Sequence, residues 1–91
     1  MNYLEVRISN VGNIESYDRA KQIIESVNES LSVVKIVDPI LKGNAIIGKI
    51  DTKETELGKK VIDEMEEVGG IEFEGRRVYV DYRVKNESVS F

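Results

Sequence analysis

The 91-residue sequence contains no cysteine and no histidine. The missing cysteine excludes disulfide bonds, thiolate metal ligands and a cysteine nucleophile. The missing histidine removes the side chain that most often serves as a general base or metal ligand. Catalysis would have to use carboxylates, lysine or tyrosine, and the acidic run at 63–67 has the pattern of a solvated helix face. We therefore expect a protein that is not an enzyme and holds no cofactor and no metal ion.

Long apolar runs are also missing. No stretch approaches the ~18 residues that a membrane span needs, and the first ten residues lack the apolar segment of a signal peptide. We therefore expect no membrane partner. Acidic residues outnumber basic residues, 17 to 13, which gives a net charge of −4. That balance argues against a protein whose main task is to bind phosphate groups.

Hydrophobic periodicity divides the chain into six elements. Apolar residues that alternate or cluster in β-branched runs predict four strands, at residues 3–9, 32–38, 45–50 and 77–84. Apolar residues at helical spacing predict two helices, at residues 15–30 and 51–68, the first with an acidic outer face. Pro39 lacks a backbone N–H, so it is expected to end the second strand.

The order βαββαβ predicts an α+β, ferredoxin-like sandwich: a four-stranded antiparallel sheet with two helices on one face. Residues 1–85 form one domain in this interpretation, and residues 86–91 form a flexible tail. The nearness of the tail to the last strand is compatible with either a whole protein or the C-terminal domain of a longer one.

The last third of the chain resembles the C-terminal half of an RNA-recognition motif (RRM), in which a helix leads through a Gly-Arg turn into a last strand with the pattern Val-x-Val-Asp. The matching residues are Gly58, Val61, Ile62, Met65, Phe73, Gly75, Arg76, Val78, Val80 and Asp81. Residues 6–11 are similar to the short RRM signature, and residues 42–47 follow the longer signature in outline. The resemblance implies an RRM sandwich, RNA processing and a nuclear location.

The stacking aromatics of RRMs are replaced here. RRMs bind RNA by stacking bases on aromatic side chains of the two central strands. At those positions this sequence has Arg7, Asn44 and Ile46. An alignment shifted by one residue places Ala45 and Ile47 on the open face instead, and it restores no aromatic side chain.

Weak RNA binding stays possible without those aromatics. Tyr3 and Tyr79, interpreted as residues of the outer strands, could stack one base, and Arg7, Arg77 and Lys49 could contact phosphates. The alternative interpretation is that these are solvated residues of a sheet face. The residues assigned to this RNA-binding alternative are Tyr3, Arg7, Asn44, Ile46, Arg77 and Tyr79.

An acidic RRM without stacking aromatics is similar to the auxiliary-factor homology motifs (UHMs) of splicing factors, which bind protein. In that family, a tryptophan of a short basic peptide enters a pocket between the first helix and the loop before the last strand. The first helix supplies carboxylates, and an Arg-x-Phe motif encloses the tryptophan. The resemblance implies a peptide site at Asp18, Glu25, Glu29, Ile71 and Phe73, with Ile71 at the arginine position. Alternatively, Phe73 is a core residue and the acidic face is merely solvated.

Three functions stay open. The leading hypothesis is a UHM-like interaction module that binds a short, basic, Trp-containing peptide of a splicing or RNA-processing factor. The second hypothesis is weak or partner-assisted binding of single-stranded RNA. The third is a structural domain that packs on other subunits, or self-associates, through an apolar sheet face that includes Ile46.

Overall fold

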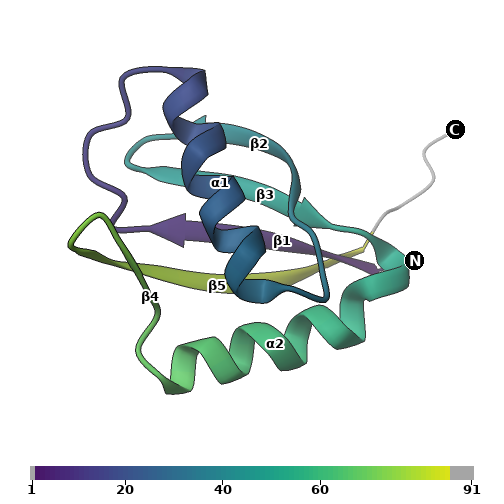
Figure 1. Cartoon of the computed structure of the whole chain (residues 1–91). Coiled ribbons are helices and arrows are strands. Elements are labelled where there is room, and N and C mark those ends of the chain that lie inside the picture. The colour runs from purple at the N-terminus through teal and green to yellow at the C-terminus, as the bar shows by residue number, and fades with distance from the viewer. Residues whose placement is uncertain (1, 87–91) are drawn as a thin grey trace, which may run out of the picture.

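Two helices lie on one face of an antiparallel sheet in the computed structural model, which describes residues 2–86 (Figure 1). The elements are β1 (Asn2–Ser9), α1 (Tyr17–Leu31), β2 (Val37–Lys42), β3 (Ala45–Ile50), a 3₁₀ turn η1 (Thr52–Glu54), α2 (Thr55–Glu67), β4 (Ile71–Phe73) and β5 (Arg76–Asn86). The strand order is β2-β3-β1-β5-β4, with every pair antiparallel. The α+β, ferredoxin-like architecture is confirmed.

The sheet has five strands, and the expected number of four is wrong. The additional strand, β4, pairs with the start of β5 through a hairpin whose turn is Glu74-Gly75. Both turn residues have positive φ, 49° and 77°, which is the conformation that tight hairpins with a right-handed twist require. Three residues are too few to show an alternating pattern, so β4 gave no periodic signal in the sequence.

The second strand lies further along the chain than expected. Residues 32–38 were predicted to form a strand ended by Pro39, whereas β2 begins at Val37 and contains Pro39. The pairing register shifts between Val37 and Ile40, so β2 is bulged opposite Gly48 of β3. A proline is tolerated at a bulge on an edge strand, where its missing N–H breaks no ladder. The bulge also deters further strands from adding to this edge.

The apolar residues before β2 are buried in a loop. Val34 and Ile36 are almost inaccessible to solvent. The side chain of Asn28 on α1 supplies the hydrogen bonds that a strand partner would have supplied: its Oδ1 accepts from the Ile36 N–H at 2.8 Å and its Nδ2 donates to the Ile36 carbonyl at 3.2 Å. The β-branched run therefore reflects burial and not strand pairing, which explains the misplaced prediction.

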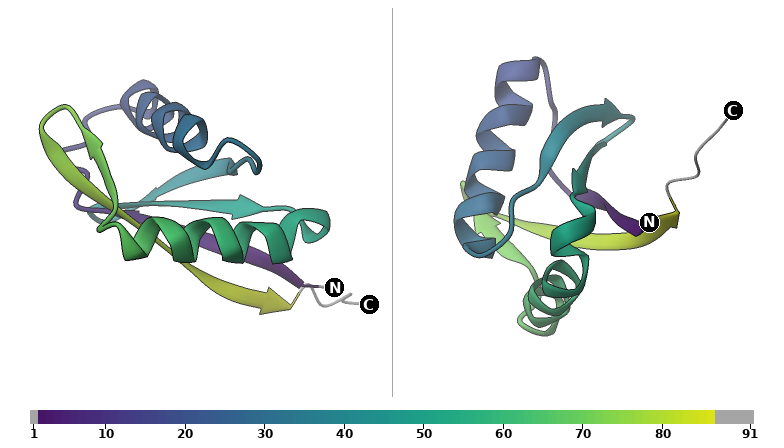
Figure 2. Two further views of the ribbon diagram at one scale, coloured as in Figure 1. Left: turned by 60° about the horizontal axis from the view of Figure 1, so that its bottom comes forward. Right: turned by 90° about the vertical axis from the view of Figure 1, so that its right-hand side faces the viewer.

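The core lies between the sheet and the helices. It includes Leu4, Val6 and Ile8 of β1, Ile23 and Val27 of α1, Ile46 and Ile50 of β3, Ile62 and Met65 of α2, and Val78 and Val80 of β5. Because strand residues alternate between faces, the intervening residues lie on the side that neither helix covers (Figure 2). We call this side the open face.

The ends of the elements follow local hydrogen bonds. Ser16 accepts from the Arg19 N–H at 3.2 Å and starts α1. The second helix was expected at 51–68, but Asp51 accepts from the Thr52 N–H at 2.7 Å and caps η1, and α2 begins at Thr55. Asn86 is the last residue of β5 and not the first residue of a tail; the rest of the predicted tail, 87–91, lies outside the described residues.

Gly48 is expected to tolerate no side chain. A Cβ at Gly48 would lie 2.2 Å from Cγ2 of the buried Ile36, and overpacking a core typically costs about 1–3 kcal/mol. We expect Gly48→Ala to lower the free energy of unfolding by that amount in chemical denaturation. In an Ile36→Ala background the space is vacated, so the same change should cost clearly less. An equal cost in both backgrounds would contradict the packing explanation.

Candidate binding surfaces

The open face carries the residues that alternate with the core. They include Tyr3, Glu5, Arg7 and Ser9 of β1, Ile40 and Lys42 of β2, Ala45, Ile47 and Lys49 of β3, Glu72 of β4, and Arg77, Tyr79, Asp81, Arg83 and Lys85 of β5. The strand pairing fixes their neighbours. Arg7 lies between Ile47 and Asp81, and Glu5 lies between Lys49 and Arg83.

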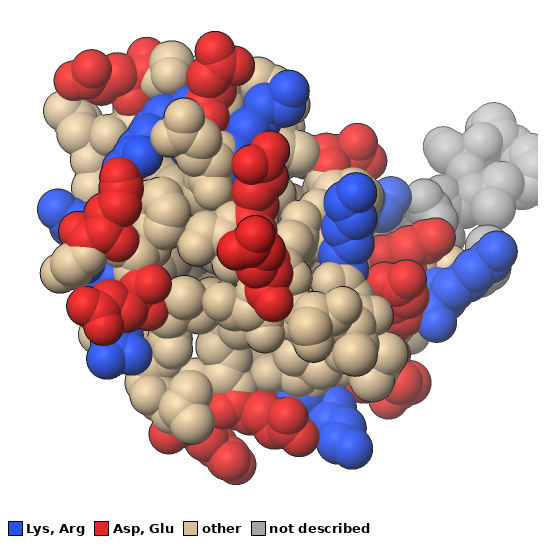
Figure 3. Space-filling view, viewed as in Figure 1, with Lys and Arg blue, Asp and Glu red and all other residues tan. Residues whose placement is uncertain are grey.

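The open face is cationic although the chain is acidic. Its basic residues are Arg7, Lys42, Lys49, Arg77, Arg83 and Lys85, and its carboxylates are Glu5, Glu72 and Asp81. On the opposite side of the molecule, acidic side chains lie over α1 and along α2 (Figure 3). The net charge of −4 is therefore unevenly distributed. It does not argue against an anionic ligand on this face.

A shallow hollow of about 860 Å³ lies on the open face between β2 and β5. Ile40, Ala45 and Ile47 supply its apolar part. Three cations, Arg7, Lys42 and Arg83, lie beside them and outnumber the two carboxylates of the lining, Glu5 and Asp81. An apolar surface next to cations can accept a ligand that is both flat and anionic.

Register decides which of the predicted RNA-binding residues reach the open face. Tyr3, Arg7, Arg77 and Tyr79 do, and Tyr79 is 49% exposed. Ile46 is fully buried against the helices, so its expected place on the open face is wrong. Asn44 lies in the two-residue turn between β2 and β3.

The turn between β2 and β3 explains why Ile46 faces the core and not the open face. The loop pairs Lys42 directly with Ala45, and in a hairpin the loop length sets the register. Ala45 and Ile47 therefore face outwards, as in the shifted alignment. A slip of one residue exchanges the two faces of a strand.

The two tyrosines of the open face cannot stack the same base. Tyr3 lies on β1, which is the central strand of the sheet and not an outer one. Tyr79 pairs with Ser9, six residues further along β1 than Tyr3, which corresponds to about 20 Å. The Nζ atom of Lys49 lies 4.4 Å from the centre of the Tyr3 ring. Tyr79 thus presents the more accessible ring.

A second candidate surface is the Phe73 corner, formed by Arg19 of α1, Phe73 of β4 and Glu74 of the hairpin turn. The Arg19 guanidinium lies over the Phe73 ring, with Cζ 5.2 Å from the ring centre. Its Nη2 donates to Glu74 Oε1 at 2.9 Å, and its Nη1 donates to Gln22 Oε1 at 3.0 Å. The hydrogen bond to Glu74 raises the pKa of Arg19, and that from Arg19 lowers the pKa of Glu74. Arg19 therefore covers one face of Phe73.

The residues predicted to bind a peptide lie on two neighbouring surfaces. Asp18, Glu25 and Glu29 are exposed along α1. Ile71 and Phe73 are partly buried and pack against the core. Sequence reasoning did not identify Arg19, because its contact with Glu74 joins residues 55 positions apart and leaves no local pattern.

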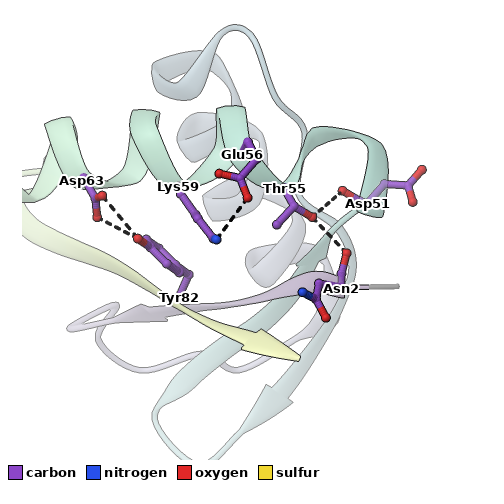
Figure 4. Close-up of polar contacts among 7 residues, drawn as sticks. All are labelled: Asn2, Asp51, Thr55, Glu56, Lys59, Asp63 and Tyr82. Carbon is purple, nitrogen blue, oxygen red and sulfur yellow. Dashed lines mark hydrogen bonds and ion pairs between the residues drawn. The ribbon is translucent and has the colours of Figure 1, made fainter. Parts of the chain in front are cut away.

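The back of β5 is fixed to α2 by a hydrogen bond that the sequence did not predict (Figure 4). The Tyr82 hydroxyl donates to the Asp63 carboxylate, at 3.0 Å to Oδ1 and 3.3 Å to Oδ2. At the other end of α2, the Thr55 hydroxyl donates to the Asn2 carbonyl at 3.1 Å. These two contacts attach β1 and β5 to α2. The same two strands carry most of the charges of the open face.

Two kinds of feature do not occur in residues 2–86. No three acidic side chains come together in an arrangement that could hold a metal ion. Neither helix is long and apolar enough to cross a membrane.

Comparison with known proteins yields a fold and no family. No protein-family model matches the sequence, and no curated protein matches it. Among solved structures, a chain in the structure of the Chaetomium thermophilum Mex67:Mtr2 complex is similar, with a TM-score of 0.61 and 10% sequence identity over 99% of this chain and 100% of that chain. At this identity the likeness shows a shared fold alone.

The Tyr82–Asp63 hydrogen bond predicts a loss of stability at alkaline pH. Burial, and then the bond to Asp63, raises the pKa of Tyr82 above its ordinary value of 10.0. The stabilisation is therefore present below that value and is lost as the pH rises through the folded-state pKa. We expect Tyr82→Phe to cost about 1 kcal/mol or less at neutral pH.

Chemical denaturation of both proteins at about pH 8 and about pH 11 checks this linkage. The difference in unfolding free energy between wild type and Tyr82→Phe should shrink at the higher pH. Tyr79→Phe is the matched control, because Tyr79 lies on the open face. This variant should leave the unfolding free energy unchanged at both pH values. A difference that is independent of pH would contradict the assigned cause.

Proposed function

We propose that the protein is a binding module that holds single-stranded RNA weakly on its open face, mainly through its phosphates. The observation that carries this proposal is the separation of charge, with basic residues concentrated on the open face of an acidic chain. RNA as the polyanion, a role in RNA processing and a nuclear location come from the RRM resemblance and are part of the proposal.

The spacing of the basic side chains suits an extended ligand. Lys42 on β2 and Arg83 on β5 belong to strands three positions apart in the sheet, which corresponds to about 14 Å. Arg7 on β1 lies between them. A single strand that crosses the sheet can therefore meet several cations in succession.

Base stacking adds little to this interaction. Each base stacked on an aromatic side chain contributes roughly 1–3 kcal/mol. Tyr79 is 49% exposed, whereas Lys49 lies over the Tyr3 ring. Phosphate contacts then dominate the affinity, and such binding is weak, tolerant of sequence and strongly dependent on salt.

Peptide binding is a second candidate. The exposed carboxylates Asp18, Glu25 and Glu29 favour a basic peptide on α1. The similar solved chain belongs to a protein complex, which is compatible with a protein partner. Arg19 covers the face of Phe73 towards α1, so an aromatic side chain could reach that face only after Arg19 moves. For this reason we rank peptide binding below RNA binding.

A purely structural role has the least support. The apolar sheet face expected to drive self-association included Ile46, and Ile46 belongs to the core. The apolar residues of the open-face hollow are Ile40, Ala45 and Ile47, and cations adjoin them. An interface between copies would have to bury those charges, which is costly unless they are paired.

Fluorescence anisotropy with a labelled oligouridine tests RNA binding. We expect a logarithmic affinity that falls linearly with the logarithm of salt concentration, with a slope of about −0.7 for each phosphate contacted. Arg7→Ala and Arg83→Ala should each weaken binding and reduce the slope by about 0.7. Lys60→Ala, an exposed charge on α2, is the control. Equal losses in all three variants, or salt-independent affinity, would reject the open face as the site.

NMR titration with a basic, Trp-containing peptide tests the second candidate. If the Phe73 corner binds the tryptophan, amides of α1 and Phe73 shift, Phe73→Leu weakens binding, and Arg19→Ala strengthens it by uncovering the ring. Arg83→Ala on the open face should have no effect. Shifts confined to the open face, or no shifts at all, would exclude peptide binding at this corner.

A further inference from the structure

We propose that a phosphate group binds in a polar hollow at the end of the sheet, outside the open face. The hollow has a volume of about 330 Å³ and is lined by Asn10, Val11, Gly12, Asn13, Asn44 and Arg76. We call it the Arg76 hollow. Its residues come from the loop after β1, the β2–β3 turn and the start of β5, which meet at the left-hand end of the sheet in Figure 1.

The electrostatics of the Arg76 hollow differ from those of its surroundings. Each of the other hollows described for residues 2–86 is lined by at least two carboxylates: Glu5 and Asp81, Glu15 and Asp18, or Asp38, Asp51 and Glu54. The Arg76 hollow has none, although acidic residues outnumber basic ones in the chain. Its charge comes from Arg76 alone, so the ligand that it suits is an anion.

The Arg76 guanidinium lies close to Gly12. A Cβ at Gly12 would lie 3.2 Å from each of the Cζ, Nε and Nη2 atoms of Arg76. Equal distances to three atoms of a planar group place that position over the face of the plane. The guanidinium therefore turns its face, and not its N–H edges, towards Gly12, which leaves those edges available to donate.

The donors of Arg76 have no protein acceptor among the described residues. Within residues 2–86, the Arg76 guanidinium makes no hydrogen bond and no ion pair with another residue, whereas the Arg19 guanidinium makes both. The Asn10 Nδ2 atom donates to the Arg77 carbonyl at 2.7 Å, which fixes the loop after β1 beside Arg76. The carboxamides of Asn13 and Asn44 add further N–H donors to the wall.

A phosphate group fits this donor set, because it has oxygens for both the guanidinium and the carboxamides. A guanidinium offers parallel N–H groups that match two oxygens of a phosphate, and such charge-assisted pairs are stronger than neutral hydrogen bonds. The remaining oxygens can accept from the carboxamides. Since a water molecule takes up roughly 30 Å³, the hollow has room for a phosphate group and several waters.

A titration of the labelled protein with inorganic phosphate at constant ionic strength tests the site. We expect saturable NMR shifts at the Gly12 amide and at the side-chain amides of Asn13 and Asn44. Arg76→Ala should weaken binding by about tenfold or more, because the charged fork is lost. Arg76→Lys retains the charge without the fork and should give an intermediate affinity.

A pair of glycine substitutions separates stacking from backbone strain. Gly12 and Gly69 both have positive φ, 75° and 84°, but no atom lies within 4 Å of a Cβ placed at Gly69. Both alanine variants therefore carry similar strain, and Gly12→Ala alone displaces the guanidinium. Phosphate binding should weaken in Gly12→Ala and stay unchanged in Gly69→Ala.

A second titration identifies the source of the phosphate. Tighter binding of uridine 5′-monophosphate than of inorganic phosphate assigns the hollow to a nucleotide, and equal binding assigns it to the bare ion. Lys60→Ala, which removes an exposed charge on α2, should leave both affinities unchanged. Shifts that increase without saturation, or that persist unaltered in Arg76→Ala, would overturn the proposed site.

Discussion

Burial of one face of β1 determines the rest of the structure. Leu4, Val6 and Ile8 have no solvent exposure, and burying each such side chain stabilises the fold by about 1.5–3 kcal/mol. With these three turned towards the helices, the alternating geometry of a strand leaves Glu5 and Arg7 no place except the open face. Because β1 is the central strand, its pairing with β3 and β5 also determines which residues of those strands face the helices. The same residues that make the core thus place the charges.

The sequence predicted the architecture because its periodic segments are long. The alternation of β1 and β5 and the helical stripe of α1 extend over enough residues to distinguish periods of 2 and 3.6. Prediction failed where burial occurred without regular structure, at Val34 and Ile36, and where β4 was too short to repeat. It also failed at Ile46. A shift of the alignment by one residue does not change an apolar run, and only the pairing of Lys42 with Ala45 across the turn determines which residues face the core.

The candidate sites were less predictable than the fold. Exposed carboxylates on α1 followed from helical spacing, since that is a local property. The contact of Arg19 with Phe73, the bond of Tyr82 to Asp63 and the packing of Arg76 on Gly12 each join distant parts of the chain. No pattern of residue types along a sequence encodes such pairs. The overall charge was equally uninformative, because a sum over the chain contains nothing about its arrangement in space.

The separation of charge between the two layers gives the molecule an electric dipole moment directed from the helices towards the sheet. In the field of a polyanion such a body experiences a torque as well as a net force, and the torque turns the sheet towards the polyanion before contact. The overall negative charge, with a sequence pI near 4.9, repels the polyanion at long range, where only the monopole matters. For the proposed polyanionic ligand, we therefore expect helix-first encounters to be repelled and sheet-first encounters to be favoured at short range.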